Sequence, residues 1–119
     1  MSKTLVLGAS TNPSRVSYDA VHRLKNAGEE VIPLSNKKGE IADIPILNDT
    51  PELEGIDTIT LYLNPQRQVF YYDYILSLKP HRIIFNPGTE NPELSKLARE
   101  KGIETENACT LVMLATGTY

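Results

Sequence analysis

The stretch TLVLGASTNPSRVS, residues 4–17, decides the fold class of this chain. A short apolar run stops at Gly8, small and hydroxyl-bearing residues follow, and an amphipathic segment begins near Ser14. This order is typical of a buried parallel strand that leads into a helix whose free N–H groups can hold a phosphate. Nucleotide or cofactor binding is therefore the first functional hypothesis.

The rest of the chain alternates apolar runs with amphipathic segments in the same way. Strands are predicted at residues 4–7, 30–34, 58–63, 82–85 and 104–107, helices at 18–25 (stopped by Gly28), 66–78 and 91–101, and a final apolar turn or helix at 109–115. Gly39 predicts the bend of a turn or short hairpin over 35–43, and Thr50 and Pro51 predict a short helix start. The alternation favours a Rossmann-like α/β fold, with an about five-stranded, mainly parallel sheet and helices on both faces, in one domain over 1–119.

Composition and charge exclude several classes of protein. Hydrophobic residues make up 40% of the 119 residues and charged residues 23%, which allows a packed core and argues against disorder. The formal net charge is -3, so no global basic field attracts nucleic acid. We expect a cytoplasmic protein without a membrane span, because no apolar run approaches roughly 18 residues and no leader precedes the first strand. Cys109, the single cysteine, excludes an internal disulfide and is a poor basis for a metal site.

The predicted strand ends carry small polar residues. In such a sheet, ligands bind beyond the carboxyl ends of the strands, near the point where the strand order switches. Asparagine followed by proline stands at three of these ends, at Asn12, Asn64 and Asn86. Asparagine and proline are also good turn formers, which is the alternative at any one of them. Because all three fall on the same edge of the sheet, a shared binding crevice is favoured.

Three features of these ends bear on the choice of cofactor. The opening loop lacks the Gly-x-Gly-x-x-Gly pattern of dinucleotide sites, because no second glycine follows Gly8 within the loop. The second strand ends in Ser-Asn-Lys-Lys, residues 35–38, where an acidic residue would contact a ribose hydroxyl. Cations there suit a phosphate, and a solvated turn is the alternative for Lys37. Arg15 and Ser17 stand where a guanidinium and a hydroxyl can bind phosphate oxygens, with a surface ion pair as the alternative for Arg15.

Four segments carry a family resemblance: GASTNPSRVS at 8–17, VIPLSN at 31–36, NPGT at 86–89 and GIETENACT at 102–110. In this order at the predicted strand ends, they resemble the stand-alone CoA-binding domain proteins. Those proteins are similar to the Rossmann-like CoA-binding domain of the succinyl-CoA synthetase alpha subunit. The resemblance covers essentially the full chain, and it implies binding of coenzyme A or an acyl-CoA across the strand ends.

The resemblance also implies roles for individual residues. Residues 9–12 and Arg15 would face the phosphates, and Lys37 would lie near the ribose phosphate. Leu63 and Asn64 would flank the adenine, and the segment from Asn86 to Gly88 would lie on the pantetheine side. The predicted cofactor-binding residues are Gly8, Ala9, Ser10, Thr11, Asn12, Arg15, Ser17, Ser35, Asn36, Lys37, Leu63, Asn64, Asn86, Pro87, Gly88, Asn107 and Cys109.

The chain departs from the family pattern at the adenosine end. The family usually has Val-Asn-Pro after the second strand, where this chain has Leu-Ser-Asn at 34–36. The family also often has a longer following segment with a glycine before a tyrosine, and here that part is short, Ile-Ala-Asp-Ile-Pro-Ile at 41–46.

The sequence offers no evident catalytic constellation. The synthetase transfers a phosphoryl group with a histidine in another domain, which has no counterpart among these segments. His22 and His81 are predicted to be surface or packing residues. No serine stands in a nucleophile-elbow pattern, and Glu90 and Glu106 lack an evident partner. Cys109 is either a thiol able to form a mixed disulfide with CoA or a small buried cysteine.

Two classes of function therefore stay open. The leading hypothesis is a non-catalytic CoA-binding module that senses, carries or presents the cofactor. The alternative is an enzyme or enzyme subunit, which either binds a nicotinamide dinucleotide or completes an acyl-CoA ligase with a partner chain. The absent glycine pattern and acidic residue count against the nicotinamide version. A structural protein with an empty ancestral pocket is the third possibility.

Aromatic residues crowd the predicted helix at 66–78. Phe70, Tyr71, Tyr72 and Tyr74 cannot all face one core stripe, so at least one ring is expected at the surface. Exposed aromatic side chains often mark contacts with another chain, which predicts a homo-oligomer that forms through this helix.

Overall fold

The sheet that the sequence predicts is present in the computed structural model, which describes residues 2–119. Its five strands are β1 (Lys3–Leu7), β2 (Glu30–Leu34), β5 (Thr58–Leu61), β6 (Arg82–Phe85) and β7 (Glu104–Asn107). They pair in the order β2-β1-β5-β6-β7, and every pairing between them is parallel. The predicted Rossmann-like α/β fold is confirmed.

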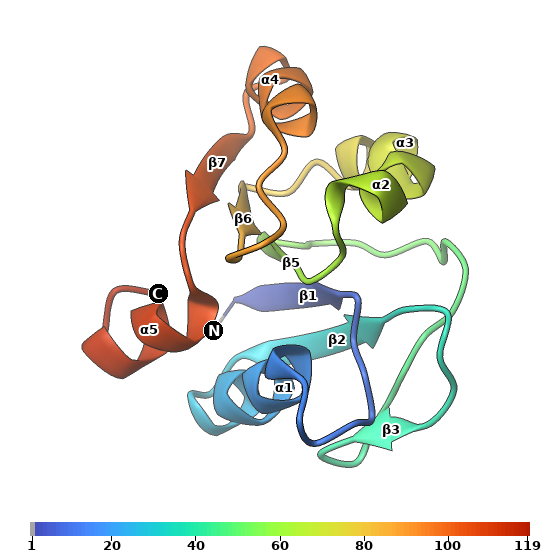
Figure 1. The fold of residues 1–119 in the computed structure, drawn as a ribbon, viewed down its shortest axis with the longest axis vertical. Helices are drawn as coiled ribbons and strands as arrows, with labels where there is room; N and C mark the ends of the chain where they lie inside the picture. Colours follow the sequence, from blue (N-terminus) through green and yellow to red (C-terminus); the bar gives the residue numbers. More distant parts are fainter. Residues whose placement is uncertain (1) are drawn as a thin grey trace.

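Helices cover both faces of this sheet (Figure 1). They are α1 (Val16–Asn26), α2 (Pro65–Gln68), the 3-10 turn η1 (Val69–Tyr71), α3 (Tyr72–Ser77), α4 (Pro92–Glu100) and α5 (Thr110–Thr116). Helices α1 and α5 contact each other on one face, while α3 and α4 bury Ile75 and Leu94 against the other. Asn91 caps α4 by accepting a hydrogen bond from the Leu94 N–H, and Pro92 stands in its first turn, as predicted. Within residues 2–119, every helix is too short or too polar to cross a lipid bilayer.

The strand order reverses at β1. The chain passes from β1 through α1 to β2 on one side, and β5 later pairs with the other side of β1. The carboxyl ends of β1 and β5 therefore flank a topological switch point, which is where open α/β sheets bind ligands. Pro33 is tolerated within β2 because β2 is an edge strand of this sheet.

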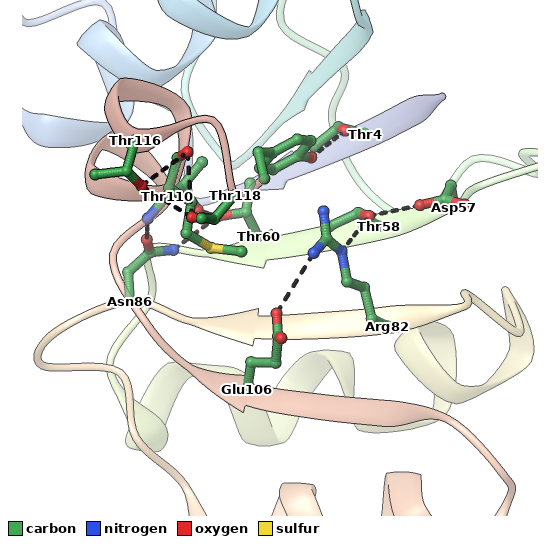
Figure 2. A network of polar contacts seen from close by, with 12 residues as sticks. Thr4, Asp57, Thr58, Thr60, Arg82, Asn86, Glu106, Thr110, Thr116 and Thr118 are labelled. Atoms are coloured by element: carbon green, nitrogen blue, oxygen red, sulfur yellow. Dashed lines mark hydrogen bonds and ion pairs between the residues drawn. The ribbon is translucent and has the colours of Figure 1, made fainter. Parts of the chain in front are cut away.

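The two faces of the sheet differ in polarity. Alternate residues turn apolar side chains toward α3 and α4, where Leu5 and Ile59 are fully buried. On the opposite face, β5 presents the buried hydroxyl groups of Thr58 and Thr60. Figure 2 shows how partners within the protein satisfy this polar face, with Arg82 Nε donating to Thr58 Oγ1 at 3.0 Å. Buried polar groups require such partners to offset the loss of water.

The segment after β2 forms a hairpin with a different turn from the one predicted. Strand β3 (Glu40–Ile41) pairs antiparallel with β4 (Ile44–Pro45). Ala42 and Asp43 make the turn of this hairpin at φ 52° and 66°, while the chain also bends at Gly39, as predicted, with φ 131°. Two consecutive positive φ angles are typical of the tight type I′ turn, whose twist matches that of a hairpin.

Two predicted helices also differ from the structure. Residues 50–53 form no helix, and the Tyr74 hydroxyl donates to the Pro51 carbonyl oxygen at 2.6 Å, which ties this segment to α3. The predicted helix at 66–78 is divided into α2, η1 and α3, because Tyr71 leaves the helical region at φ -113° and ψ 2°. Strand β5 ends at Leu61, earlier than the sequence predicts.

Candidate functional site

A hollow of about 400 Å³ opens at the carboxyl ends of β1, β2, β5 and β6, over the switch point. Its wall brings together several predicted cofactor-binding residues: Gly8, Ala9, Ser10, Arg15, Ser17, Ser35, Asn36, Lys37, Leu63 and Pro87. It also includes residues outside the predicted set: Ser14, Val16, Tyr62, Arg67 and Thr89. We refer to this space as the cationic hollow, for the charges described below.

Gly8 lets the loops of two neighbouring strands meet at the floor of the cationic hollow. Its φ is +102°, and a Cβ atom built on it would lie 2.9 Å from the carbonyl carbon of Tyr62 and 3.2 Å from the Leu63 side chain. The Gly8 N–H donates to the Leu34 carbonyl oxygen at 2.8 Å, which joins the end of β1 to the end of β2. A side chain at this position would meet backbone atoms that cannot rotate away, so glycine is required.

The loop between β1 and α1 leaves the start of α1 open toward the hollow. Asn12 folds the loop on itself, since its Oδ1 accepts from the Ser14 N–H at 3.0 Å and from the Ser14 hydroxyl at 2.8 Å. Arg15 is the N-cap of α1, and its side chain makes no capping hydrogen bond. Val16 and Ser17, the first residues of this eleven-residue helix, line the hollow. Their N–H groups and the helix dipole favour an anion there.

Every formally charged side chain in the wall of the hollow is a cation. These side chains are Arg15, Lys37 and Arg67, on a chain whose formal net charge is -3. Within residues 2–119, the ion pairs lie elsewhere, between Lys3 and Glu30 and between Arg82 and Glu106. The three cations of the hollow are therefore free to bind an anionic ligand. The surface ion pair that was the alternative for Arg15 does not form in the structure.

Comparison with protein families decides the family of the chain. The family model described as CoA binding domain matches residues 2–115 of the chain. The chain belongs to the CoA-binding domain family. The resemblance carried by the strand-end segments is thereby confirmed.

Solved structures resemble this CoA-binding domain over its full length. A crystal structure of an uncharacterized protein is 55% identical, covers 100% of this chain and 98% of its own, and superposes with a TM-score of 0.98. A hypothetical protein from Pyrococcus horikoshii OT3 is 23% identical over 95% of this chain and 81% of its own, with a TM-score of 0.86. A Thermus thermophilus protein is 21% identical over 99% of this chain and 90% of its own, also at 0.86, and these two show the fold alone. No curated protein matches the chain.

Arg67 is the cation of the CoA-binding domain that the sequence prediction missed. Asn64 caps α2, with its Oδ1 accepting from the Arg67 N–H at 3.0 Å, and Pro65 stands in the first turn. An asparagine cap followed by proline puts the residue three positions after the cap in the first helical turn. The segment Asn-Pro-Gln-Arg at 64–67 has this pattern and directly follows a predicted strand. It therefore indicates that Arg67 lies in a helical turn at the carboxyl edge of the sheet.

A second hollow of about 450 Å³ adjoins the first. The two share Ser35, Asn36, Leu63 and Arg67 in their walls. The second is otherwise lined by Asp49, Thr50, Phe70 and Tyr71. We refer to it as the aromatic hollow, because its own side chains include two aromatic rings. The ligand-accessible space at this edge therefore has two lobes of different chemistry.

Tyr62 contributes to the wall of the cationic hollow, and its hydroxyl is buried inside the protein. Burial raises the pKa of Tyr62 to about 12, and the hydroxyls of Thr60 and Thr110 limit the rise. Those two threonine hydroxyls bond to each other at 2.8 Å, and among the described residues none meets hydrogen-bond geometry with the Tyr62 oxygen. The phenol is therefore neutral at physiological pH and does not add a negative charge to the site.

Asn86 uses its whole side chain to join three elements, as Figure 2 shows. Its Nδ2 donates to Thr60 Oγ1 at 2.6 Å and to the Leu61 carbonyl oxygen at 2.8 Å, which ties the end of β6 to β5. Its Oδ1 accepts from the Thr110 N–H at 2.9 Å, which fixes the start of α5. With every polar atom paired inside the protein, the Asn86 amide holds the loops of the site in place and is absent from the wall of the hollow.

Other predicted residues also lie outside the wall of the cationic hollow. They are Thr11, Asn12, Asn64, Gly88, Asn107 and Cys109. Thr11 contacts the loop after β2, since a Cβ atom built at Gly39 would meet its Cγ2 at 2.8 Å. Cys109 is a half-buried free thiol at the N-cap of α5. Asn12 and Asn64 shape loops around the site, Asn12 by its bonds to Ser14 and Asn64 by capping α2.

The histidines and carboxylates that the sequence raised as candidates lie apart from the hollow. His22 stacks on Tyr18 of the same helix with ring centroids 4.7 Å apart, and His81 is exposed before β6. Glu90 accepts from the Gly88 N–H at 2.9 Å, and Glu106 is the partner of Arg82. Among residues 2–119, no three His, Cys, Asp or Glu side chains gather as metal ligands would.

Proposed function

We propose that the protein binds coenzyme A or an acyl-CoA in the cationic hollow and does not itself catalyse a reaction. The observation that carries this proposal is the convergence of Arg15, Lys37 and Arg67 around the start of α1, with no carboxylate in the wall. CoA carries a pyrophosphate and a ribose phosphate, so several cations at one site match its charge. The family assignment over residues 2–115 supports the same ligand.

The first loop is the part best suited to the pyrophosphate. Arg15 can donate charge-assisted hydrogen bonds to phosphate oxygens, beside those from the N–H groups at the start of α1, and such bonds are about twice as strong as neutral ones. Gly8 and Ala9 bring backbone atoms close to the ligand without bulky side chains. The proposal therefore has the phosphates at the β1–α1 loop and the remainder of the cofactor across the neighbouring strand ends.

The ionisable groups around the hollow support binding without catalysis. They are the three cations and Tyr62, whose pKa is raised to about 12. Among residues 2–119, the wall holds no histidine, aspartate or glutamate, the side chains that most often act as general acid or base. A ligase subunit, the alternative of another class, would take its reacting groups from a separate chain. A nicotinamide dinucleotide is the other alternative. In the described part of the chain, no acidic residue lines the cationic hollow, but Asp49 lines the adjoining aromatic hollow and could contact a ribose hydroxyl, so binding measurements with NAD and NADP decide this point.

Calorimetry with CoA, dephospho-CoA, NAD and NADP tests the proposal. We expect CoA to bind more tightly than either nicotinamide dinucleotide. Arg15→Ala should weaken CoA binding about tenfold, through loss of a charge-assisted contact to phosphate. Arg23→Ala is the matched control, because Arg23 lies in the last turn of the same helix, and it should leave binding unchanged.

Three results would count against this proposal. Tighter binding of NAD or NADP than of CoA would favour the nicotinamide alternative. Failure of all four compounds to bind would show that the hollow of this chain alone does not bind a nucleotide cofactor. Equal losses in Arg15→Ala and Arg23→Ala would mean that the effect of arginine removal is not local to the hollow.

A further inference from the structure

Arg67 is the one formally charged side chain shared by the cationic and aromatic hollows. Lys37 and Arg15 line the first hollow only. Arg67 stands in the first turn of α2, and its guanidinium makes no hydrogen bond or ion pair with residues 2–119. A ligand that occupies both lobes must pass this unpaired cation.

A buried amide fixes the turn that carries Arg67. Gln68 is fully buried, and its Nε2 donates to the carbonyl oxygens of Leu63 and Thr89, each at 2.8 Å. Its Oε1 accepts from Asn91 Nδ2 at 2.9 Å. These bonds link α2 to the loops after β5 and β6 and to the cap of α4. Arg67 is therefore held on a rigid turn above both lobes, although its own side chain is exposed.

The two lobes suit different parts of a nucleotide. The cationic hollow has Arg15 and the N–H groups of α1, which suit a pyrophosphate. The aromatic hollow adds Phe70 and Tyr71 to Leu63, and flat apolar and aromatic surfaces suit a purine base. The ribose joins these two parts in an adenine nucleotide, so it would lie at the boundary of the lobes, where Arg67 stands.

We infer that Arg67 is a specificity-determining residue, which binds the 3′-phosphate on the ribose of CoA and so distinguishes CoA from dephospho-CoA. This inference rests on the proposed function, because it requires the pyrophosphate at the start of α1. It assigns to Arg67 the role that the family resemblance implies for Lys37. Arginine suits the task because its planar guanidinium can bind two phosphate oxygens at once.

The test compares the affinities of CoA and dephospho-CoA by calorimetry in a set of variants. We expect the native protein to prefer CoA about tenfold, the effect of one charge-assisted contact, and Arg67→Ala to reduce that ratio to near one. The affinity of Arg67→Ala for dephospho-CoA should change little. Arg67→Lys should keep part of the preference, since it keeps the charge without the fork of donors. Arg15→Ala should weaken both compounds alike and keep the ratio, and thermal unfolding checks that each variant is folded.

The outcomes separate this inference from the proposed function. If the native protein binds both compounds with equal affinity, or if Arg67→Ala keeps the full preference, the inference is overturned and CoA binding stands. If Lys37→Ala abolishes the preference while Arg67→Ala does not, the ribose phosphate lies against the loop after β2 instead. If the native protein binds neither compound, the proposed function fails, and the inference fails with it.

Discussion

The two ends of the sheet each carry a hollow, and the larger one lies opposite the candidate site. It measures about 650 Å³ and is lined by Asp73, Leu76, Ser77, Lys79, Pro80, Lys101, Gly102 and Ile103. The cationic hollow at the carboxyl ends of the strands is smaller, at about 400 Å³. Volume alone would therefore favour the amino end over the site that we propose for an anionic cofactor.

Helix direction makes the difference between the two ends. Helix α1 begins at the carboxyl end and directs free N–H groups and a partial positive charge into the hollow. Helices α3 and α4 finish at the amino end, with caps at Leu78 and Lys101, so carbonyl groups and a partial negative charge face that side. The hollow at this end is also lined by Lys79 and Lys101, whose positive charges offset the negative charge of Asp73 and of the helix ends. The chemistry of the wall, more than its volume, is thus the basis for proposing the phosphate site at the carboxyl end.

Glycine substitutions at the two ends give the largest expected difference. Gly8→Ala should lower the free energy of unfolding by about 3 kcal/mol or more, because it adds a backbone clash to a positive φ. Gly102→Ala is the matched variant at the amino end, where φ is +78° and nothing lies within 4 Å of the added Cβ. It should cost only about 1–2 kcal/mol, through backbone strain alone. Urea unfolding of both variants measures the difference, and equal losses would mean that the close approach at Gly8 is not a constraint.

Much of the fold follows from local sequence patterns. The predicted bounds of β2, β6 and β7 match the structure, and α4 begins at the predicted Asn91 cap. Apolar runs, turn residues and caps are properties of neighbouring residues, so one sequence contains them. The segments that were predicted wrongly depend on distant contacts. Residues 50–53 are tied to α3 by Tyr74, and the loop after β2 is held by Asn48, whose Nδ2 donates to the Ser35 and Lys37 carbonyl oxygens at 2.8 Å.

Some residues of the candidate site could likewise be predicted from local sequence patterns, and others could not. The β1–α1 loop could be predicted because strand, glycine and helix start are consecutive, and Gly8, Arg15 and Ser17 do line the hollow. Arg67 escaped prediction because a cation in the first turn of a short helix forms no familiar motif. Asn86 was predicted to lie beside the ligand, and its structural role depends on the Thr110 N–H, which is distant in the sequence. Which partners a polar side chain such as that of Asn86 bonds to can be read only from the three-dimensional contacts.

Unfolding at alkaline pH tests the protonation state of Tyr62 at the carboxyl end of the sheet. Tyr62 keeps its proton until about pH 12 in the folded protein, whereas in the unfolded chain it ionises from its ordinary value of 10.0. The unfolded state therefore releases this proton first, and stability that is present below pH 10 is lost as the pH rises toward 12. We expect this one group to remove about 2 kcal/mol by pH 12.

Tyr62→Phe isolates that contribution. Burial also raises the pKa of Tyr72, Tyr74 and Tyr119, so the difference between native protein and variant is the quantity to measure. At pH 7 the variant should be within about 1 kcal/mol of the native protein, because the lost hydroxyl has no partner among residues 2–119. At pH 11–12 it should become the more stable of the two in denaturant titrations. Parallel losses of stability in both proteins would show that Tyr62 ionises in the folded state as easily as in the unfolded chain.

The smallest effect that we expect is on self-association of the protein, through exposed residues near the carboxyl end of the sheet. Phe70 is the exposed ring of the aromatic cluster, with 84% of its surface accessible, and Val69 beside it is 53% exposed. We propose that two copies of the chain associate weakly through this turn. Phe70→Ser should weaken the association about tenfold, since it removes one exposed aromatic contact. Tyr71→Ala is a poorer test, because Tyr71 packs against the core and its loss would also affect folding.

Sedimentation velocity over a range of concentrations measures this association. Val112→Ser is the matched control, because Val112 is 57% exposed on α5, away from the turn that carries Phe70. It should sediment as the native protein does, while Phe70→Ser shifts toward monomer. A native protein that stays monomeric at every concentration would refute the proposal and leave Phe70 only its place in the wall of the aromatic hollow. Equal shifts in both variants would indicate general loss of surface hydrophobicity, without a defined interface at the carboxyl end.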